Sequence, residues 1–220
     1  MRKIFLVLLI AIGSIVSAQT AKEIIDKNIE LSGGLNNWKL LNSVLLQGRV
    51  TLGINDEYPI KIYQQRPNLT KTTITIGKKE TAVEGYNGTK GYAMNYAANK
   101  IQEYPNYIAE SFDNDFIDWE NKGFEAKYLG KEKIDDIYCH KLELTKNVNK
   151  SIYFFDTKTY MLLKEIKKDE ILIYSDYKMV GNLMMPYRIE SSSPKKESDY
   201  VMMLNKIETN KVFPVNTFKF

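Results

Sequence analysis

The sequence predicts an α+β fold in which a single curved antiparallel sheet of about eleven strands has helices covering its concave face. Three observations predict it. Apolar and polar residues alternate with a period of two along most of the chain, short turn-forming links separate these segments, and two other segments have helical periodicity. A sheet of this width is expected to curl. The length of 220 residues fits one domain.

The first 18 residues have the features of a secretory signal peptide. Arg2 and Lys3 precede an apolar run over residues 4–16 that is short for a membrane span, and small residues follow it up to Ala18. We expect cleavage after Ala18. This leaves residues 19–220 as a single domain without a stable membrane span, located in the periplasm or secreted. An uncleaved membrane anchor is the alternative.

The charge balance of the cleaved chain argues against a nucleic-acid partner. The full sequence has 31 Lys and Arg against 27 Asp and Glu, and cleavage removes two of the basic residues. Little net positive charge then remains, whereas a protein that binds nucleic acid carries a basic patch or stripe.

A first helix is expected to begin near Thr20 and to end at Gly33 and Gly34. Thr20 and Glu23 have the spacing of a capping box, in which each side chain accepts a hydrogen bond from a free backbone amide at the start of a helix. The two glycines supply the left-handed conformation that ends a helix. Its apolar side consists of Ile24, Ile25, Ile29 and Leu31, and a second short turn through Leu35, Trp38 and Leu41 packs beside it.

From Ser43 onward the apolar period is two, which predicts strands with one face toward water. In residues 44–52 the even positions are apolar apart from Gly48, whereas Gln47 and Arg49 face the other way. The links between strands contain turn residues such as Asn-Gly and Asp-Asp pairs. The further predicted strands are residues 60–65, 69–76, 81–86, 91–96, 125–133, 138–145, 151–156, 161–167, 171–177, 187–191 and 200–209.

One segment interrupts the alternation. Between Pro105 and Gly123, apolar residues recur at helical offsets, and acidic residues occupy many of the other positions. The pattern predicts an amphipathic helix of about four turns with a solvated acidic face. A cation site is not expected, because the spacing and glycine turn of a calcium loop are missing. The apolar residues are Ile108, Phe112, Phe116 and Trp119, and the acidic ones are Glu110, Asp113, Asp115, Asp118 and Glu120.

Residues that usually perform catalysis or bind metals are scarce. The chain has one cysteine and one histidine, too few for an intrachain disulfide, a zinc site or an iron–sulfur cluster. Cys139 and His140 are adjacent in a predicted strand, so their side chains point to opposite faces and cannot act as a nucleophile and its base. We expect no cofactor, no metal and no enzymatic activity, and we interpret His140 as a core or cavity-lining residue.

The inward-facing side chains of the sheet and of the predicted helix are the candidate functional residues. Two interpretations remain open for them. They form an ordinary packed core, or they line an apolar cavity for an acyl chain or a similar ligand, because the sheet is too wide for its two helices. The candidate cavity-lining residues are Val44, Leu46, Val50, Leu52, Ile74, Ile76, Met94, Phe112, Phe116, Trp119, His140, Leu142, Leu144 and Met203.

Short motifs follow one another along the chain after the signal peptide. They are Gly33-Gly34-Leu35 with Trp38, Gln65-Arg66-Pro67-Asn68, Tyr86-Asn87-Gly88, Leu142-x-Leu144, Asp156-Thr157, Ser175-Asp176-Tyr177-Lys178, and the closing Asn210, Pro214 and Phe218. In this order and spacing the chain resembles exported, outer-membrane lipoprotein-sorting-like proteins of the lipoprotein-localisation superfamily (LolA/LolB-like). It departs from them at Asp135-Asp136, where such sequences often have Asp-Gly. No residue here is matched to the acyl-release arginine of the authentic carrier.

The resemblance implies an unclosed antiparallel half-barrel with helices over its concave side and a hydrophobic cavity. In the characterised relatives that cavity takes the acyl chains of lipoproteins in transit between membranes, without catalysis. We therefore predict a periplasmic lipid- or lipoprotein-binding carrier. Its expected partners are an acyl chain, a lipoprotein or another apolar ligand, and an envelope partner protein.

Three other functions are consistent with parts of the sequence. They are an envelope accessory or structural subunit with a filled core, an outer-membrane β-barrel, and a hydrolase that uses Asp or Glu groups in the hollow. The C-terminal Phe220 is typical of the barrel, but the short predicted strands and Pro214 in the last segment argue against it. Only the presence of carboxylates favours the hydrolase.

Overall fold

The computed structural model describes residues 20–53, 56–194 and 199–220, so the predicted signal peptide, residues 1–18, lies outside the described chain. Residues 20–31 are helical, and the short helix α2, Leu35–Leu40, follows. Both helices are expected from the sequence; where the first one begins lies outside the described residues. Within the described part of the chain, neither helix combines the length and the hydropathy needed to cross a membrane.

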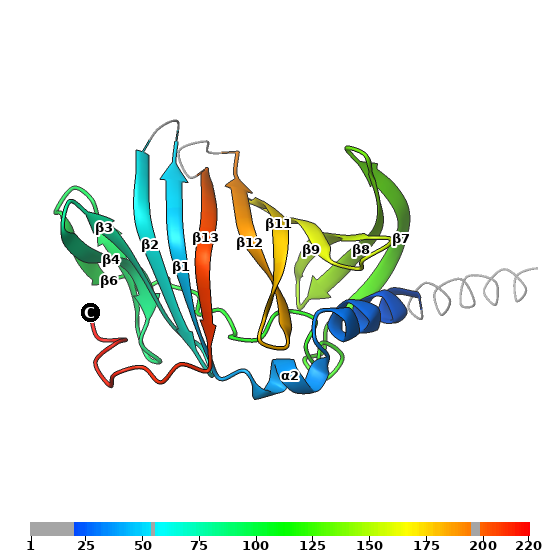
Figure 1. Cartoon of the computed structure of the whole chain (residues 1–220), viewed down its shortest axis with the longest axis horizontal. Coiled ribbons are helices and arrows are strands. Elements are labelled where there is room, and N and C mark those ends of the chain that lie inside the picture. The colour runs from blue at the N-terminus through cyan, green and yellow to red at the C-terminus, as the bar shows by residue number, and fades with distance from the viewer. Residues whose placement is uncertain (1–19, 54–55, 195–198) are drawn as a thin grey trace, which may run out of the picture.

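The rest of the fold is one antiparallel sheet of thirteen strands that curls without closing (Figure 1). The order across the sheet is β6-β5-β4-β3-β2-β1-β13-β12-β11-β10-β9-β8-β7, so β6 and β7 are its free edges. The strands are β1 (Ser43–Leu52), β2 (Asp56–Gln65), β3 (Leu69–Ile76), β4 (Lys79–Tyr86), β5 (Gly91–Asn95), β6 (Lys100–Glu103), β7 (Glu125–Ile134), β8 (Ile137–Lys146), β9 (Asn149–Asp156), β10 (Leu162–Ile166), β11 (Ile171–Val180), β12 (Leu183–Ser192) and β13 (Tyr200–Thr209).

The path of the chain through the sheet has one crossover. From β1 in the middle the chain runs outward, strand by strand, to β6 at one edge. Residues 104–124, which we call the crossover loop, lead to β7 at the other edge, and the chain returns strand by strand to β13 beside β1. The crossover loop therefore has to pass the whole width of the sheet, and it does so on the concave side (Figure 1).

The predicted fold class, with one curved antiparallel sheet, is confirmed, and the strand number is thirteen instead of about eleven. The sequence did not predict β6, because its four residues, Lys-Ile-Gln-Glu, are too few to show an alternation. The hairpin of β11 and β12 is longer than predicted and reaches its turn at Gly181, which has a φ of 60°.

The crossover loop contradicts the predicted amphipathic helix, because it consists of turns. The side chain of Asn114 accepts hydrogen bonds from the amides of Phe116 and Ile117 at 3.0 and 3.1 Å, which is the arrangement of an N-cap, so a new turn begins here instead of a helix continuing through Asn114. Asp118 and Gly123 have positive φ values of 53° and 73°, which a right-handed helix excludes. The apolar spacing that predicted a helix thus belongs to an irregular segment.

The acidic side chains of the crossover loop also differ from the prediction of a solvated helix face, because they tie the loop to four other elements. Asp113 pairs with Arg66 just after β2, and Asp115 pairs with Lys146 at the end of β8. The other two pairs reach α2 and the first helix: Asp118 with Lys39 at 2.8 Å, and Glu120 with Lys22 at 3.1 Å.

Two hydrophobic clusters pack against the sheet. The central cluster covers the middle strands beneath α2 and consists of Leu41, Val44, Val50, Ile60, Ile74, Leu183, Met185, Met202, Leu204 and Ile207. The helix cluster joins the first helix and the crossover loop to β8 and β9, and it consists of Ala21, Ile24, Ile25, Phe116, Trp119, Leu142, Leu144, Tyr153 and Phe155. The crossover loop packs on both clusters, since Phe112 lies against the central one.

Gly33 brings the end of the first helix against the turn between β11 and β12. A β-carbon at this position would lie 2.2 Å from the carbonyl oxygen of Asn182, and the φ of Gly33 is 128°. Next to it, the amide of Met184 donates a hydrogen bond of 2.9 Å to the carbonyl of Ser32. Only glycine allows this backbone-to-backbone approach.

We expect Gly33→Ala to lower the free energy of unfolding by about 2–4 kcal/mol, because it combines an unfavourable φ with a clash against backbone. Gly181→Ala, in the same β11–β12 turn, is the matched control. Gly181 also has a positive φ, 60°, but a β-carbon added there would meet no atom within 4 Å, so the loss should stay near about 1 kcal/mol. Equal losses in urea unfolding would show that the contact with Asn182 is unimportant.

Arg66 joins α2, the end of β2 and the crossover loop. Its Nε donates to the carbonyl of Leu41 at 2.7 Å, and its Nη2 donates to the carbonyl of Trp38 at 3.2 Å. Both terminal nitrogens donate to the carboxylate of Asp113, and the guanidinium lies 5.0 Å from the ring centre of Phe112. This bidentate, partly buried ion pair between Arg66 and Asp113 holds the crossover loop over the central cluster.

We expect Asp113→Asn to lower the free energy of unfolding by about 1–3 kcal/mol and to speed amide hydrogen exchange in the crossover loop, because Arg66 loses its counter-charge. Asp118→Asn removes the more exposed pair with Lys39, and asparagine tolerates the positive φ, so we expect a loss below about 1 kcal/mol. Exchange rates in the loop that rise equally in both variants would contradict the special role of Arg66.

Candidate functional site

A cavity of about 1410 Å³ lies between the central cluster and the helix cluster. Sites that bury a drug-sized ligand measure about 300–1,000 Å³, so this cavity is large enough for a long flexible molecule. Its apolar wall comes from the inward faces of β1, β12 and β13 and from the crossover loop: Val44, Leu46, Met185, Ile189, Leu204, Ile207, Phe112 and Phe116.

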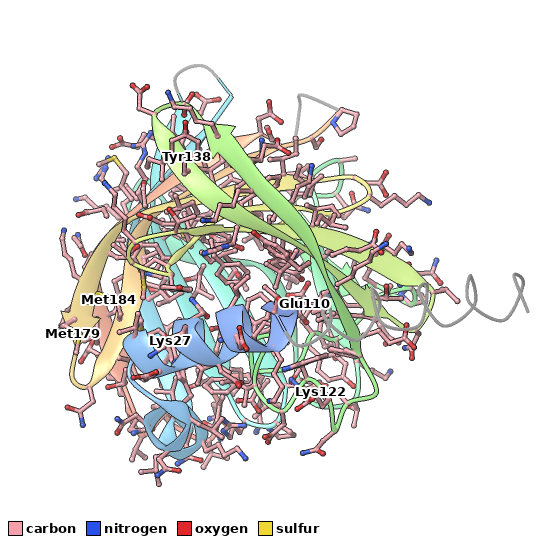
Figure 2. The ribbon with its side chains drawn as sticks, turned by 90° about the vertical axis from the view of Figure 1, so that its right-hand side faces the viewer. Lys27, Glu110, Lys122, Tyr138, Met179 and Met184 are labelled. Atoms are coloured by element: carbon pink, nitrogen blue, oxygen red, sulfur yellow. The ribbon has the colours of Figure 1, made fainter. Side chains whose placement is uncertain are left out.

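Another part of the wall is polar, which the sequence did not predict. It comes from the β8–β9 turn, from the end of β10 with the β10–β11 turn, and from residues 108–115 of the crossover loop. Glu110, one of its members, is labelled in Figure 2. We call this part the polar wall; its charged members are Glu110, Asp113, Asp115, Lys146, Lys150, Glu165, Lys167, Lys168, Asp169 and Glu170.

Glu165 is the most buried charged residue of the polar wall, with 5% of its surface exposed. Its Oε2 accepts a hydrogen bond from the Tyr174 hydroxyl at 3.1 Å, whereas no described residue donates a hydrogen bond to its Oε1. The ammonium of Lys167 lies 3.8 Å from Oε1, beyond hydrogen-bond distance. Burial raises the pKa of the Glu165 carboxyl, and the charge of Lys167 opposes this effect.

Asp115, near Glu165, accepts two hydrogen bonds of 2.7 Å at its Oδ2, one from the Lys146 ammonium and one from the Tyr153 hydroxyl. Burial raises the pKa of Tyr153 and Tyr174, so both hydroxyls stay protonated and act as donors. Burial lowers the pKa of Lys167, but nearby carboxylates, Glu165 first among them, outweigh it and raise the pKa, so the ammonium stays charged.

Four of the predicted cavity-lining residues lie on the cavity wall: Val44 and Leu46 from β1, and Phe112 and Phe116 from the crossover loop. Five others are buried in the clusters around it. Val50 and Ile74 belong to the central cluster, and Trp119, Leu142 and Leu144 belong to the helix cluster. These five residues support the cavity without forming its surface.

Four predicted residues lie away from the cavity. Ile76 and Met203 are 53% and 57% exposed, Leu52 is exposed at the end of β1, and Met94 lies half-buried on β5 beside the sheet edge. The position of Met203 has a clear cause. Asn205 is an extra residue in the pairing of β13 with β1, and this β-bulge turns Met202 and Leu204 inward and Met203 outward.

His140 lies half-buried on β8, and it is not part of the cavity wall. Its ring stacks on that of Tyr160, with ring centres 5.5 Å apart, and its Nδ1 lies 3.4 Å from the Tyr128 hydroxyl. Burial lowers the pKa of His140, and Lys131 adds to the effect. Cys139 is buried as a free thiol. Among the described residues, no three His, Cys, Asp or Glu side chains are grouped to hold a metal ion.

Glu165 and Lys167 were not identified from the sequence. Counting inward positions by twos from Leu162 would select Lys164. Leu163, however, is an extra residue in the pairing of β10 with β9, and this bulge places Glu165 opposite the inward Tyr153. The sequence offered one signal for an inward charge: Glu165 stands next to Ile166 in a short strand that is otherwise mostly apolar.

Solved structures match the fold of this chain, whereas no family model and no curated protein matches its sequence. A Vibrio parahaemolyticus domain described as outer membrane lipoprotein-sorting has a TM-score of 0.60 and 11% identity, and the match covers 92% of this chain and 97% of that one. A DUF1329 family protein from Desulfovibrio piger has a TM-score of 0.59 and 11% identity over the same shares of the two chains.

A LolA superfamily protein from Nitrosomonas europaea has a TM-score of 0.57 and 14% identity, and the match covers 91% of this chain and 97% of that one. Identities this low establish the fold alone. The unclosed sheet of thirteen strands, with the helical segments of the described residues, is therefore a LolA-like fold.

Proposed function

We propose that this protein is exported to the periplasm and carries a lipid or the acyl part of a lipoprotein in its cavity, without catalysis. The observation that supports this most is the cavity of about 1410 Å³ between two separate hydrophobic clusters. The LolA-like fold supports it as well, since two of the similar structures are described as lipoprotein-sorting and as LolA superfamily proteins.

The apolar wall can supply the binding free energy. Burying one methylene group contributes about 0.8 kcal/mol, so a 16-carbon chain contributes on the order of 10 kcal/mol before the entropy of ordering the chain is subtracted. Contacts of Val44, Leu46 and Leu204 with hydrocarbon would therefore determine affinity, whereas the polar wall would determine which end of the ligand lies where.

The alternative of a structural subunit with a filled core has less support. A filled core would join the two hydrophobic clusters, but the cavity separates them, and both contribute to its wall. We expect delivery or removal of the ligand to involve an envelope partner protein, because an acyl chain in this cavity must be transferred from one apolar environment to another.

We expect the protein purified from its native envelope to retain an acyl-bearing molecule, and Leu46→Trp to reduce the bound amount by more than half. Leu46 is half-buried on the cavity wall, so a larger side chain fills ligand space while the outer parts of the fold stay unchanged. Native mass spectrometry and lipid extraction measure the bound amount per protein.

Gln47→Trp is the matched control, because Gln47 is the next residue on β1 and its side chain bonds Glu208 on the other face of the sheet. This variant should retain the wild-type amount of lipid. The proposed function is wrong if the wild-type protein carries no acyl-bearing molecule and binds none when it is offered.

A further inference from the structure

Glu165 has a side chain that is buried in a way that does not stabilise the fold. It is a carboxylate facing inward from β10, its side chain is 7% exposed, and its Oε1 receives no hydrogen bond from the described residues. A buried charged oxygen without a donor is unfavourable, and each such group in a folded protein requires an explanation. Two donors on the same wall, the Lys146 ammonium and the Tyr153 hydroxyl, both bind Oδ2 of Asp115 at 2.7 Å, so Oε1 of Glu165 is left to accept a hydrogen bond from another source.

We propose that Glu165 Oε1 binds the head group of the cavity's ligand, and that this head group is an aliphatic ammonium. The inference rests on the proposed carrier function and specifies its ligand as a cationic amphiphile. The hydrocarbon chain would lie along the apolar wall of β1, β12 and β13, and the ammonium would bind at the end of β10.

An ionised carboxylate oxygen only accepts hydrogen bonds, so the head group has to donate one, and a cationic donor favours the ionised form against the burial that raises the pKa of Glu165. The charges around the site favour a donor that is also positive. Lys146 is neutralised by Asp115, and Lys150 by Glu143, so neither provides free positive charge. Lys168 is exposed to solvent on the β10–β11 turn and is followed by the acidic Asp169. Glu110, Asp169 and Glu170 are further carboxylates of the polar wall.

Lys167 is the cation that a ligand ammonium would have to displace. Its Nζ lies 3.8 Å from Glu165 and 3.9 Å from Glu170, and it forms a hydrogen bond with neither. Its side chain is 32% exposed and has a flexible four-carbon stem, so it can turn toward Glu170 when another ammonium reaches Oε1. This geometry makes Lys167 a competitor of the ligand and Glu165 its anchor.

The test compares four amphiphiles that share a twelve-carbon chain: dodecylammonium, dodecyltrimethylammonium, dodecanol and dodecanoate. Isothermal titration with the delipidated full-length protein, below the micelle concentration of each probe, gives the affinities. We expect dodecylammonium to bind about tenfold or more tightly than dodecanoate, which corresponds to about 1.4 kcal/mol. Dodecyltrimethylammonium has the charge without an N–H donor and should bind more weakly than dodecylammonium.

Two variants should change the affinity for dodecylammonium in opposite directions. Glu165→Gln keeps the shape of the side chain and an acceptor for Tyr174. It should lower the affinity for dodecylammonium about tenfold and change the affinity for dodecanol less than about twofold. Lys167→Met removes the competing cation and should strengthen dodecylammonium binding. If Glu165→Gln fails to fold, the probe series on the wild type and the Lys167→Met variant still decide the question.

Two results would overturn the inference while leaving the carrier function intact. One is tightest binding of dodecanoate together with weaker binding in Lys167→Met, which would make Lys167 the anchor of an anionic head group. The other is equal affinity for all four probes with no effect of Glu165→Gln. If none of the probes binds and the protein carries no lipid from its native envelope, the carrier function itself fails.

Discussion

The chain has to travel from one free edge of the sheet to the other, and this crossover determines how the concave face is covered. Because β1 and β13 pair in the middle, the chain leaves the sheet at β6 and enters it again at β7. Residues 104–124 make the passage and contribute Phe112 to the central cluster and Phe116 to the helix cluster. Two clusters on either side of a passing loop leave a space between them, and that space is the cavity.

A straight helix could not have replaced the crossover loop. A helix over residues 105–123 would be roughly 28 Å long and would present one apolar stripe along one line. The loop instead meets two clusters and four charged partners that lie on different elements, Arg66, Lys146, Lys39 and Lys22. Turns at Asn114 and Asp118 redirect the chain between these contacts. Tertiary contacts therefore overrode a helical periodicity.

Most of the sheet could be predicted from the sequence, but the composition of the site could not. Alternation with a period of two identifies a strand when one of its faces is apolar and the other polar. It placed Val44 and Leu46 on the inward face, and both lie on the cavity wall. A β-bulge adds one residue and reverses the alternation beyond it. Bulges at Leu163 and Asn205 decide that Glu165 rather than Lys164, and Met202 rather than Met203, face inward. The position of a bulge cannot be read from the alternation alone, so the inward position of Glu165 was not predicted from the sequence.

The polar wall also explains how a domain of this size can contain so large a hollow. A space of about 1410 Å³ that is partly open to solvent holds water when no ligand is bound, and this water is ordered where polar groups can bind it. The carboxylates and lysines at the end of β10 and on the crossover loop supply such groups.

Hydration of the polar wall has a consequence for the choice of ligand. Water on the apolar wall of β1, β12 and β13 is released by any hydrocarbon, which favours binding without distinguishing between ligands. Water on the polar wall solvates charges, and removing it is unfavourable unless the ligand replaces its hydrogen bonds. A molecule with a long apolar chain and a polar head can cover the apolar wall and also form hydrogen bonds with the polar wall. A pure hydrocarbon can only cover the apolar wall. The same groups that make the empty cavity tolerable thus favour an amphiphile as its occupant.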